Sequence, residues 1–177
     1  MKYWTLALAS GLMLLSCECS TKKSAAPAET LEERSERRVE ARRDFLAKER
    51  ASIETYITER ELKMERTGTG LYYSLLESGS DSIKIVTMDI VEMEIKTFSL
   101  TGELLYSSDE TEPQIFKVDQ GDVEIGIHEA VKYLGLGDKG RFILPSHLAF
   151  GVAGDQNKVP PMTPLVYEIK ILSIKKS

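Results

Sequence analysis

Residues 137–171 read GDKGRFILPSHLAFGVAGDQNKVPPMTPLVYEIKI. A Gly-rich turn leads into Arg141-Phe142-Ile143-Leu144, which predicts a strand. Near the end of the stretch, every second residue is apolar, which predicts a second strand with one apolar face. The residues of that face are Leu165, Tyr167, Ile169 and Ile171. Between them lies the loop 145–164, with four prolines and two glycines. Loops of this length are often functional, so we expect a binding site here.

The region before this stretch predicts short strands and one helix. Val91, Met93, Ile95 and Thr97 alternate with charged residues, as in a strand with one wet face. Further short strands are expected at residues 104–106 and around Phe116. Apolar residues at helical spacing predict one helix of about two turns, ended by Gly135: Ile127, Ala130, Val131 and Leu134. One helix among several strands, without strand–helix alternation, indicates an α+β fold with an antiparallel sheet folded over that helix.

A long, highly charged helix is expected at residues 30–66. From residue 29 to residue 66 the chain holds 21 charged residues and no Gly or Pro. Thr30 and Glu33 match a capping box at its start. We expect this helix to space the domain from a membrane, with its C-terminal third against the domain. The heptad spacing of Val39, Leu46 and Ile53 leaves a coiled-coil dimer or a partner-docking helix open, although the other heptad core positions are mostly charged.

The N-terminus has the features of a secretory signal. Lys2 precedes an apolar stretch that is too short for the ~20 residues of a bilayer span. The ending Leu14-Leu15-Ser16-Cys17 resembles the lipobox of bacterial lipoproteins. This resemblance implies a signal peptide over 1–16, lipid attachment at Cys17 and a flexible tether over 17–29. A plain signal peptide or an uncleaved anchor is the alternative. The expected location is the bacterial cell envelope, anchored to a membrane, with the periplasmic side favoured.

Composition excludes several functional classes. Lys and Arg number 23 against 28 Asp and Glu, a net charge of −5, so nucleic acid is not an expected partner. Two cysteines cannot form a disulfide framework. Two histidines without ligand spacing give no metal site, and no cofactor is expected.

Several motifs, in order, resemble FKBP-type peptidyl-prolyl cis-trans isomerases over about half the chain, from residue 91 to 175. They are Tyr106-Ser107-Ser108, residues 123–131, Gly137-Asp138-Lys139, Ile143-Leu144-Pro145-Ser146, Leu148-Ala149-Phe150-Gly151, Val159-Pro160-Pro161 and residues 165–169. The resemblance implies an FKBP-like domain over 67–177, a bent antiparallel sheet wrapped over one short helix. The whole layout looks like the membrane-anchored FKBP lipoproteins of gliding bacteria.

The resemblance also implies a pocket that acts on proline-containing proteins. Its catalytic positions would be Phe150, Tyr167, Tyr106, Val123, Glu124 and Ile127. Its substrate-binding positions would be Ile95, Leu105, Phe116 and Val159. Phe150 replaces a family Tyr, Ile127 a Trp and Tyr106 an Asp, so weak activity is expected. Core packing is the other role open to these residues. Asp155, Gln156 and Asn157 form a polar tip that either contacts a peptide or is a solvated turn.

Three functions follow. Rotation about an X–Pro bond breaks no bond, so a pocket that prefers the twisted amide needs no nucleophile or metal. The first hypothesis is therefore an isomerase acting on exported or envelope proteins. The second is an inactive FKBP-fold chaperone or protein-binding lipoprotein. The third is a component of an envelope or motility assembly that recruits a partner through helix 30–66.

Overall fold

The computed structural model describes residues 30–79, 83–109 and 111–177. The expected signal peptide, Cys17 and the tether lie outside these residues. The elements in chain order are α1 (Leu31–Glu59), β1 (Glu65–Arg66), β2 (Tyr72–Glu77), β3 (Ile90–Ser99), β4 (Leu104–Ser107), β5 (Gln114–Lys117), α2 (Ile125–Val131), β6 (Lys139–Leu144), a 3-10 turn (Ser146–Leu148) and β7 (Leu165–Lys175). Contacts divide the chain into two units, residues 1–38 and 39–177.

The strands form one seven-stranded antiparallel sheet, which confirms the α+β prediction. Its order is β1-β2-β6-β7-β3-β4, and β5 also pairs with β3. β7 pairs with β3 along its whole length, whereas β5 pairs with its first half and β4 with its second half. The strand that pairs with this edge of β3 therefore changes from β5 to β4 near the middle of β3.

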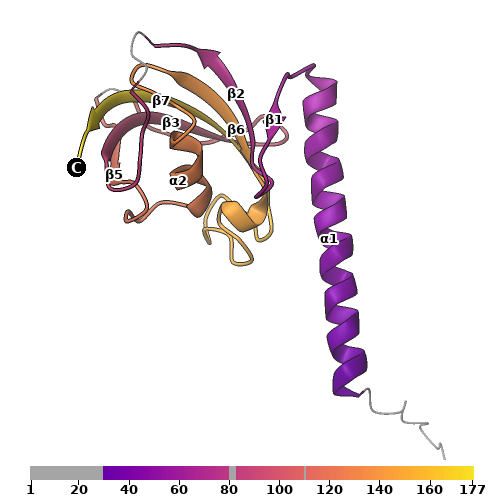
Figure 1. Cartoon of the computed structure of the whole chain (residues 1–177). Helices are drawn as coiled ribbons and strands as arrows, with labels where there is room; N and C mark the ends of the chain where they lie inside the picture. The colour runs from indigo at the N-terminus through magenta and orange to yellow at the C-terminus, as the bar shows by residue number, and fades with distance from the viewer. Residues whose placement is uncertain (1–29, 80–82, 110) are drawn as a thin grey trace, which may run out of the picture. The chain divides into compact units, whose positions relative to one another are not determined.

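A main core lies between the sheet and α2, which sits on the concave side of the sheet (Figure 1). The predicted apolar faces of β3 and β7 are buried in it. Ile127, Ala130 and Val131 of α2 are 0% exposed and fill the concavity. The helix itself ends at Val131, earlier than predicted, and Leu134 enters the core from the turn that follows.

A second core joins the end of α1 to the other face of the sheet. Four residues directly opposite one another form a row across four strands, namely Tyr72, Ile143, Val166 and Phe98. Ile53 and Tyr56 of α1 are buried against this row. The expectation that the last third of the helix packs on the domain is confirmed, and the contact explains why Val166 is buried although its neighbours on β7 face the opposite side.

The two ends of α1 have identifiable caps. At the start, the Glu33 amide donates to Thr30 Oγ1 at 3.2 Å and the Thr30 amide donates to Glu33 Oε2 at 2.8 Å, which confirms the capping box. The Thr30 backbone bond lowers the pKa of Glu33. At the other end, the Leu62 amide donates to the Ile57 carbonyl and the Glu61 amide to the Thr58 carbonyl, with Glu61 at φ 52°. These bonds form a Schellman motif.

The predicted helix over 30–66 is therefore too long. α1 ends at Glu59, and residues 65–66 form β1, which pairs with β2. The expectation failed because Glu61 occupies a left-handed position where Gly is the usual signal. Leu62 and Met64 pack on the second core, and this contact holds the chain in its new direction. Within the described residues, no helix has the length and apolar character needed to cross a membrane.

The Schellman motif predicts the effect of changing Glu61. A left-handed conformation costs a residue with a Cβ about 1 kcal/mol, and glycine avoids this cost. Glu61→Gly should therefore raise the free energy of unfolding by up to about 1 kcal/mol, measured by urea denaturation. The matched exchange Glu59→Gly, inside the helix, should lower it. Equal effects of the two exchanges would contradict this account of the helix end.

Candidate functional site

A cavity of about 520 Å³ opens where the edge of β3 passes from β4 to β5. Its wall draws on β3, β4, the start of β5, the residue before α2, the loop after the 3-10 turn, and β7. The lining residues are Ile95, Thr97, Tyr106, Ser107, Ser108, Glu112, Pro113, Gln114, Glu124, Phe150, Asp155, Asn157 and Tyr167. The loop predicted to hold a site thus supplies one side of the cavity and the sheet supplies the other.

The structure brings half of the predicted site residues together in this cavity. They are Ile95, Tyr106, Glu124, Phe150 and Tyr167. Thr97 and Tyr167 are directly opposite each other on β3 and β7, and Tyr106 is opposite Thr97 on β4. The cavity wall is therefore a row of cross-strand neighbours, closed by Phe150 from the loop.

The other predicted residues lie in or against the main core and do not line the cavity. They are Leu105, Phe116, Val123, Ile127 and Val159. Ile127 is 0% exposed and Val159 is 2% exposed. Phe116 meets the ring of His128 edge-on at 5.3 Å. The burial of these residues supports the core-packing role that the sequence left open for them. Their direct contact with substrate stays a prediction.

Sequence reasoning missed most of the polar lining. Gln114 is on the same face of β5 as Phe116 but at the start of the strand, where it reaches the cavity. The alternation of β5, which puts Gln114 on the same face as the predicted residue Phe116, was the signal that could have found Gln114. Ser108, Glu112 and Pro113 come from the connection between β4 and β5. Ser108 ends one of the family motifs, whereas no local pattern marks Glu112 and Pro113.

Asp155 fastens the loop to the sheet. Its carboxylate accepts the Tyr106 hydroxyl and the backbone amides of Asn157 (2.9 Å) and Val159 (2.7 Å). Partial burial raises the pKa of Asp155, but these hydrogen bonds outweigh it and lower the pKa to about 2. The hydrogen bond to Asp155 raises the pKa of Tyr106. The ammonium of Lys158 lies 4.9 Å from the Tyr106 ring and donates to the Leu105 carbonyl at 2.7 Å. Two of the three residues of the predicted polar tip, Asp155 and Asn157, thus line the cavity.

Glu124 and Tyr167 form the other polar contact. The Tyr167 hydroxyl donates to Glu124 Oε1 at 3.3 Å. Burial raises the pKa of Tyr167, and the Glu124 charge raises it further, so the hydroxyl keeps its proton. Among the described lining residues, three carry carboxylates (Glu112, Glu124 and Asp155) and none is Lys or Arg. The cavity therefore combines aromatic walls with a negative field.

The two histidines brace loops outside this cavity. His147 Nε2 lies 3.2 Å from the Thr69 carbonyl oxygen and so ties the 3-10 turn to the segment before β2. His128 is half-buried. Its Nδ1 accepts the Asp119 amide at 3.0 Å and its Nε2 is 3.2 Å from the Gly121 carbonyl. The described residues hold no group of His, Cys, Asp and Glu side chains arranged to bind a metal.

Comparisons with known proteins agree with this geometry. Residues 82–172 match the model of the FKBP-type peptidyl-prolyl cis-trans isomerase family, the stretch that builds the cavity. FK506-binding protein 2B of Rhizopus delemar is 36% identical over 76 residues, 42% of this chain and 36% of that protein. The macrophage infectivity potentiator of Trypanosoma cruzi is 27% identical over 93% of this chain and 80% of its own length. A crystal structure of a peptidyl-prolyl cis-trans isomerase from Pseudomonas syringae has a TM-score of 0.62 at 26% identity, covering 76% of this chain and 96% of its own.

The Asp155 contacts predict a pH dependence of stability. The pKa of this carboxyl is near 2 in the folded protein, below its ordinary value of 3.8, so its bonds stabilise the fold above about pH 4. That stabilisation is lost as the pH falls toward 2, because protonation removes the charged acceptor. In Asp155→Asn the free energy of unfolding should fall less between pH 4 and pH 2, measured by urea titration. Tyr106→Phe removes one donor and should give an intermediate slope. Parallel pH profiles for all three proteins would exclude this role.

Proposed function

Because the chain belongs to the FKBP-type peptidyl-prolyl cis-trans isomerase family, we propose that it catalyses cis–trans exchange of X–Pro bonds in the cavity of Phe150 and Tyr167. The observation that carries this proposal is the coincidence of the family match, residues 82–172, with the elements that line most of the cavity. The chain spans 36% of the length of FK506-binding protein 2B, so the proposal concerns this domain.

The geometry suits the chemistry of amide rotation. The barrier of ~18–20 kcal/mol comes from the conjugation that keeps the amide planar. A surface lowers this barrier only if it binds the twisted amide better than the planar one. Phe150 and Tyr167 present aromatic faces on which a proline ring can pack, and they exclude water from the amide. Tyr106 and Asp155 hold the loop that carries Phe150 against the sheet, so the walls are in place before substrate arrives.

Phe150 should carry much of the contact with proline. We expect the protein to accelerate exchange in a Leu-Pro peptide, measured by NMR exchange spectroscopy. Phe150→Ala should lower kcat/KM by roughly tenfold or more, since losing about 1.4 kcal/mol of transition-state contact gives a factor of ten. Val152→Ala changes a residue of the same loop that is 78% exposed and should leave the rate unchanged. A wild-type rate at background for every X–Pro peptide would refute the isomerase.

A binding role without catalysis is the second candidate. It is favoured by the polar lining and by Phe150, which has no hydroxyl to donate to a substrate carbonyl. Peptide binding at the cavity without acceleration of exchange would establish it in place of the isomerase.

The proposed substrates are exported or envelope proteins, reached from a lipid anchor at Cys17. The lipobox-like ending Leu14-Leu15-Ser16-Cys17 supports this location. Two or three acyl chains at one residue suffice for stable attachment, because each buried CH2 contributes about 0.8 kcal/mol.

The anchor predicts the mass of the mature chain. Protein purified from membranes should begin at Cys17 and carry the added mass of its acyl chains in intact-mass spectrometry. Cys17→Ala should abolish this mass and move the protein out of the membrane fraction, whereas Cys19→Ala should behave like the natural chain. An unacylated natural chain would overturn the proposed anchor.

A further inference from the structure

A second cavity, of about 580 Å³, lies between the C-terminal half of α1 and the segments around β2 and the 3-10 turn. It shares no lining residue with the first cavity. Its lining residues are Leu46, Ala47, Glu49, Arg50, Ala51, Ile53, Glu54, Arg66, Thr69, Gly70, Tyr72, Pro145 and His147. Its volume is in the range of small-ligand pockets.

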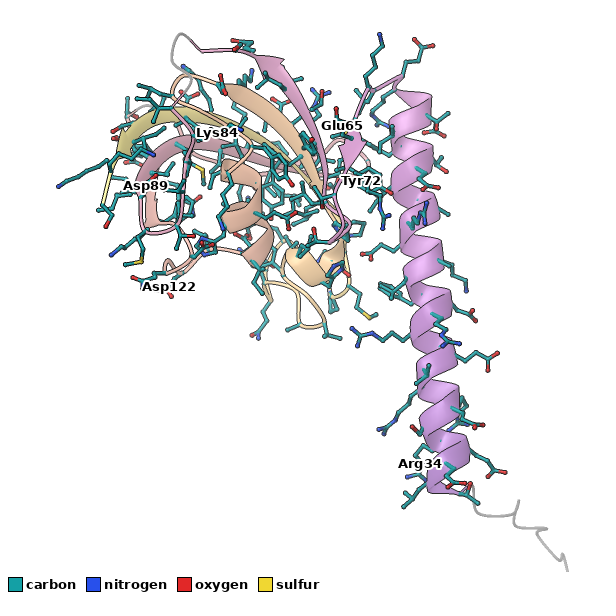
Figure 2. All side chains as sticks on the ribbon, in the orientation of Figure 1. Arg34, Glu65, Tyr72, Lys84, Asp89 and Asp122 are labelled. Carbon is teal, nitrogen blue, oxygen red and sulfur yellow. The ribbon has the colours of Figure 1, made fainter. Side chains whose placement is uncertain are left out.

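Tyr72 gives this cavity an unsatisfied polar group. The residue lies on the side of β2 that faces α1 (Figure 2), and it is 6% exposed. Its hydroxyl makes no hydrogen bond of ordinary length, and it is the one such buried side-chain atom among the described residues. The guanidinium of Arg50 acts on Tyr72 electrostatically and through a weak hydrogen bond, whereas its short hydrogen bond, at 2.7 Å, goes to Glu54. A buried hydroxyl without a partner lowers stability, so this group calls for an explanation.

The wall of this cavity offers spare hydrogen-bond donors. Each of its two carboxylates already accepts a hydrogen bond, Glu49 from the Ser146 amide at 2.8 Å and Glu54 from Arg50. Arg66 makes no ion pair with a described residue, and its guanidinium lies 5.8 Å from the centre of the Tyr72 ring. An arginine fork near the ring of a tyrosine that has hydrogen-bonding capacity left suits a carboxylate, which accepts several hydrogen bonds at once.

The rest of the wall is apolar. Leu46 and Ala47 of α1, with Ile53 deeper in the wall, face Pro145 across the cavity. We propose that this cavity binds a carboxylate carried by an apolar group, with the carboxylate on the Tyr72 hydroxyl and Arg66 and the apolar part against Leu46 and Pro145. The source is either the C-terminus of a peptide ending in an apolar residue or a free organic acid.

Matched pairs of ligands test the carboxylate. The whole chain is titrated with hexanoate and with hexylamine, and with N-acetyl-Ala-Leu as the free acid and as the amide, while amide shifts are followed by ¹H–¹⁵N NMR. Hexanoate, the free-acid peptide or both should shift residues of α1 and β2, and the tighter of the two identifies the source. The amine and the peptide amide should leave these residues unchanged. Equal shifts from acid and amine, or no shifts from either acid, would overturn the proposal.

Two variants test the assigned contacts. Tyr72→Phe removes the unsatisfied hydroxyl, so it should raise the melting temperature of the free protein. It should also lower the affinity for the acid at least tenfold. Arg66→Gln should lower the affinity for the acid by a similar factor without raising the melting temperature. Arg60→Gln is the control, because Arg60 lies over the Tyr56 ring, outside this cavity. A Tyr72→Phe protein that is less stable than the natural chain, or that binds the acid equally well, would refute the role of the hydroxyl.

Discussion

The pairing of β3 with β7 is the constraint on which both cavities depend. Ten residue pairs fix its register, from Ile90 opposite Lys175 to Ser99 opposite Leu165. Because side chains alternate between the two faces, neighbouring pairs point to opposite sides of the sheet. The pair Thr97 and Tyr167 lines the first cavity, and the next pair, Phe98 and Val166, belongs to the second core under α1. A slip of one residue would exchange these two faces and destroy both at once.

The two rows extend beyond the central pair. On the concave face the row continues through Tyr106 to the loop, where Asp155 holds it. On the other face it continues through Ile143 to Tyr72, where the second cavity begins. One strand register therefore positions residues of both cavities, although the two cavities share no lining residue. Rigid strands beneath each site also mean that the aromatic rings do not have to be ordered when a ligand arrives, which lowers the cost of binding.

The parts that sequence predicted are those governed by local periodicity. The alternation of Val91, Met93 and Ile95 specified a buried strand face, and Thr30 with Glu33 specified a helix start, because each signal lies within a few residues. The end of α1 was missed because Glu61 adopts a conformation usually reserved for glycine, held by tertiary contacts of Leu62. Only part of the lining of the first cavity was predicted. Its aromatic residues follow the family motifs, whereas its polar ones depend on which loop reaches which sheet edge.

Satisfied and unsatisfied buried polar groups separate structural from functional positions in this chain. Buried Asp89 accepts the Val86 amide and the Lys176 ammonium, and buried Glu49 accepts the Ser146 amide. The Asp89 bonds lower the pKa of that carboxyl against the opposing effect of burial, so they stabilise the fold. Tyr72 lies in the same kind of environment without a hydrogen bond of ordinary length, although phenylalanine would fill the space without this cost. A conflict between a side chain and its surroundings, in a core whose other buried polar side chains are satisfied, is expected at a functional site, and this is the role that we propose for Tyr72.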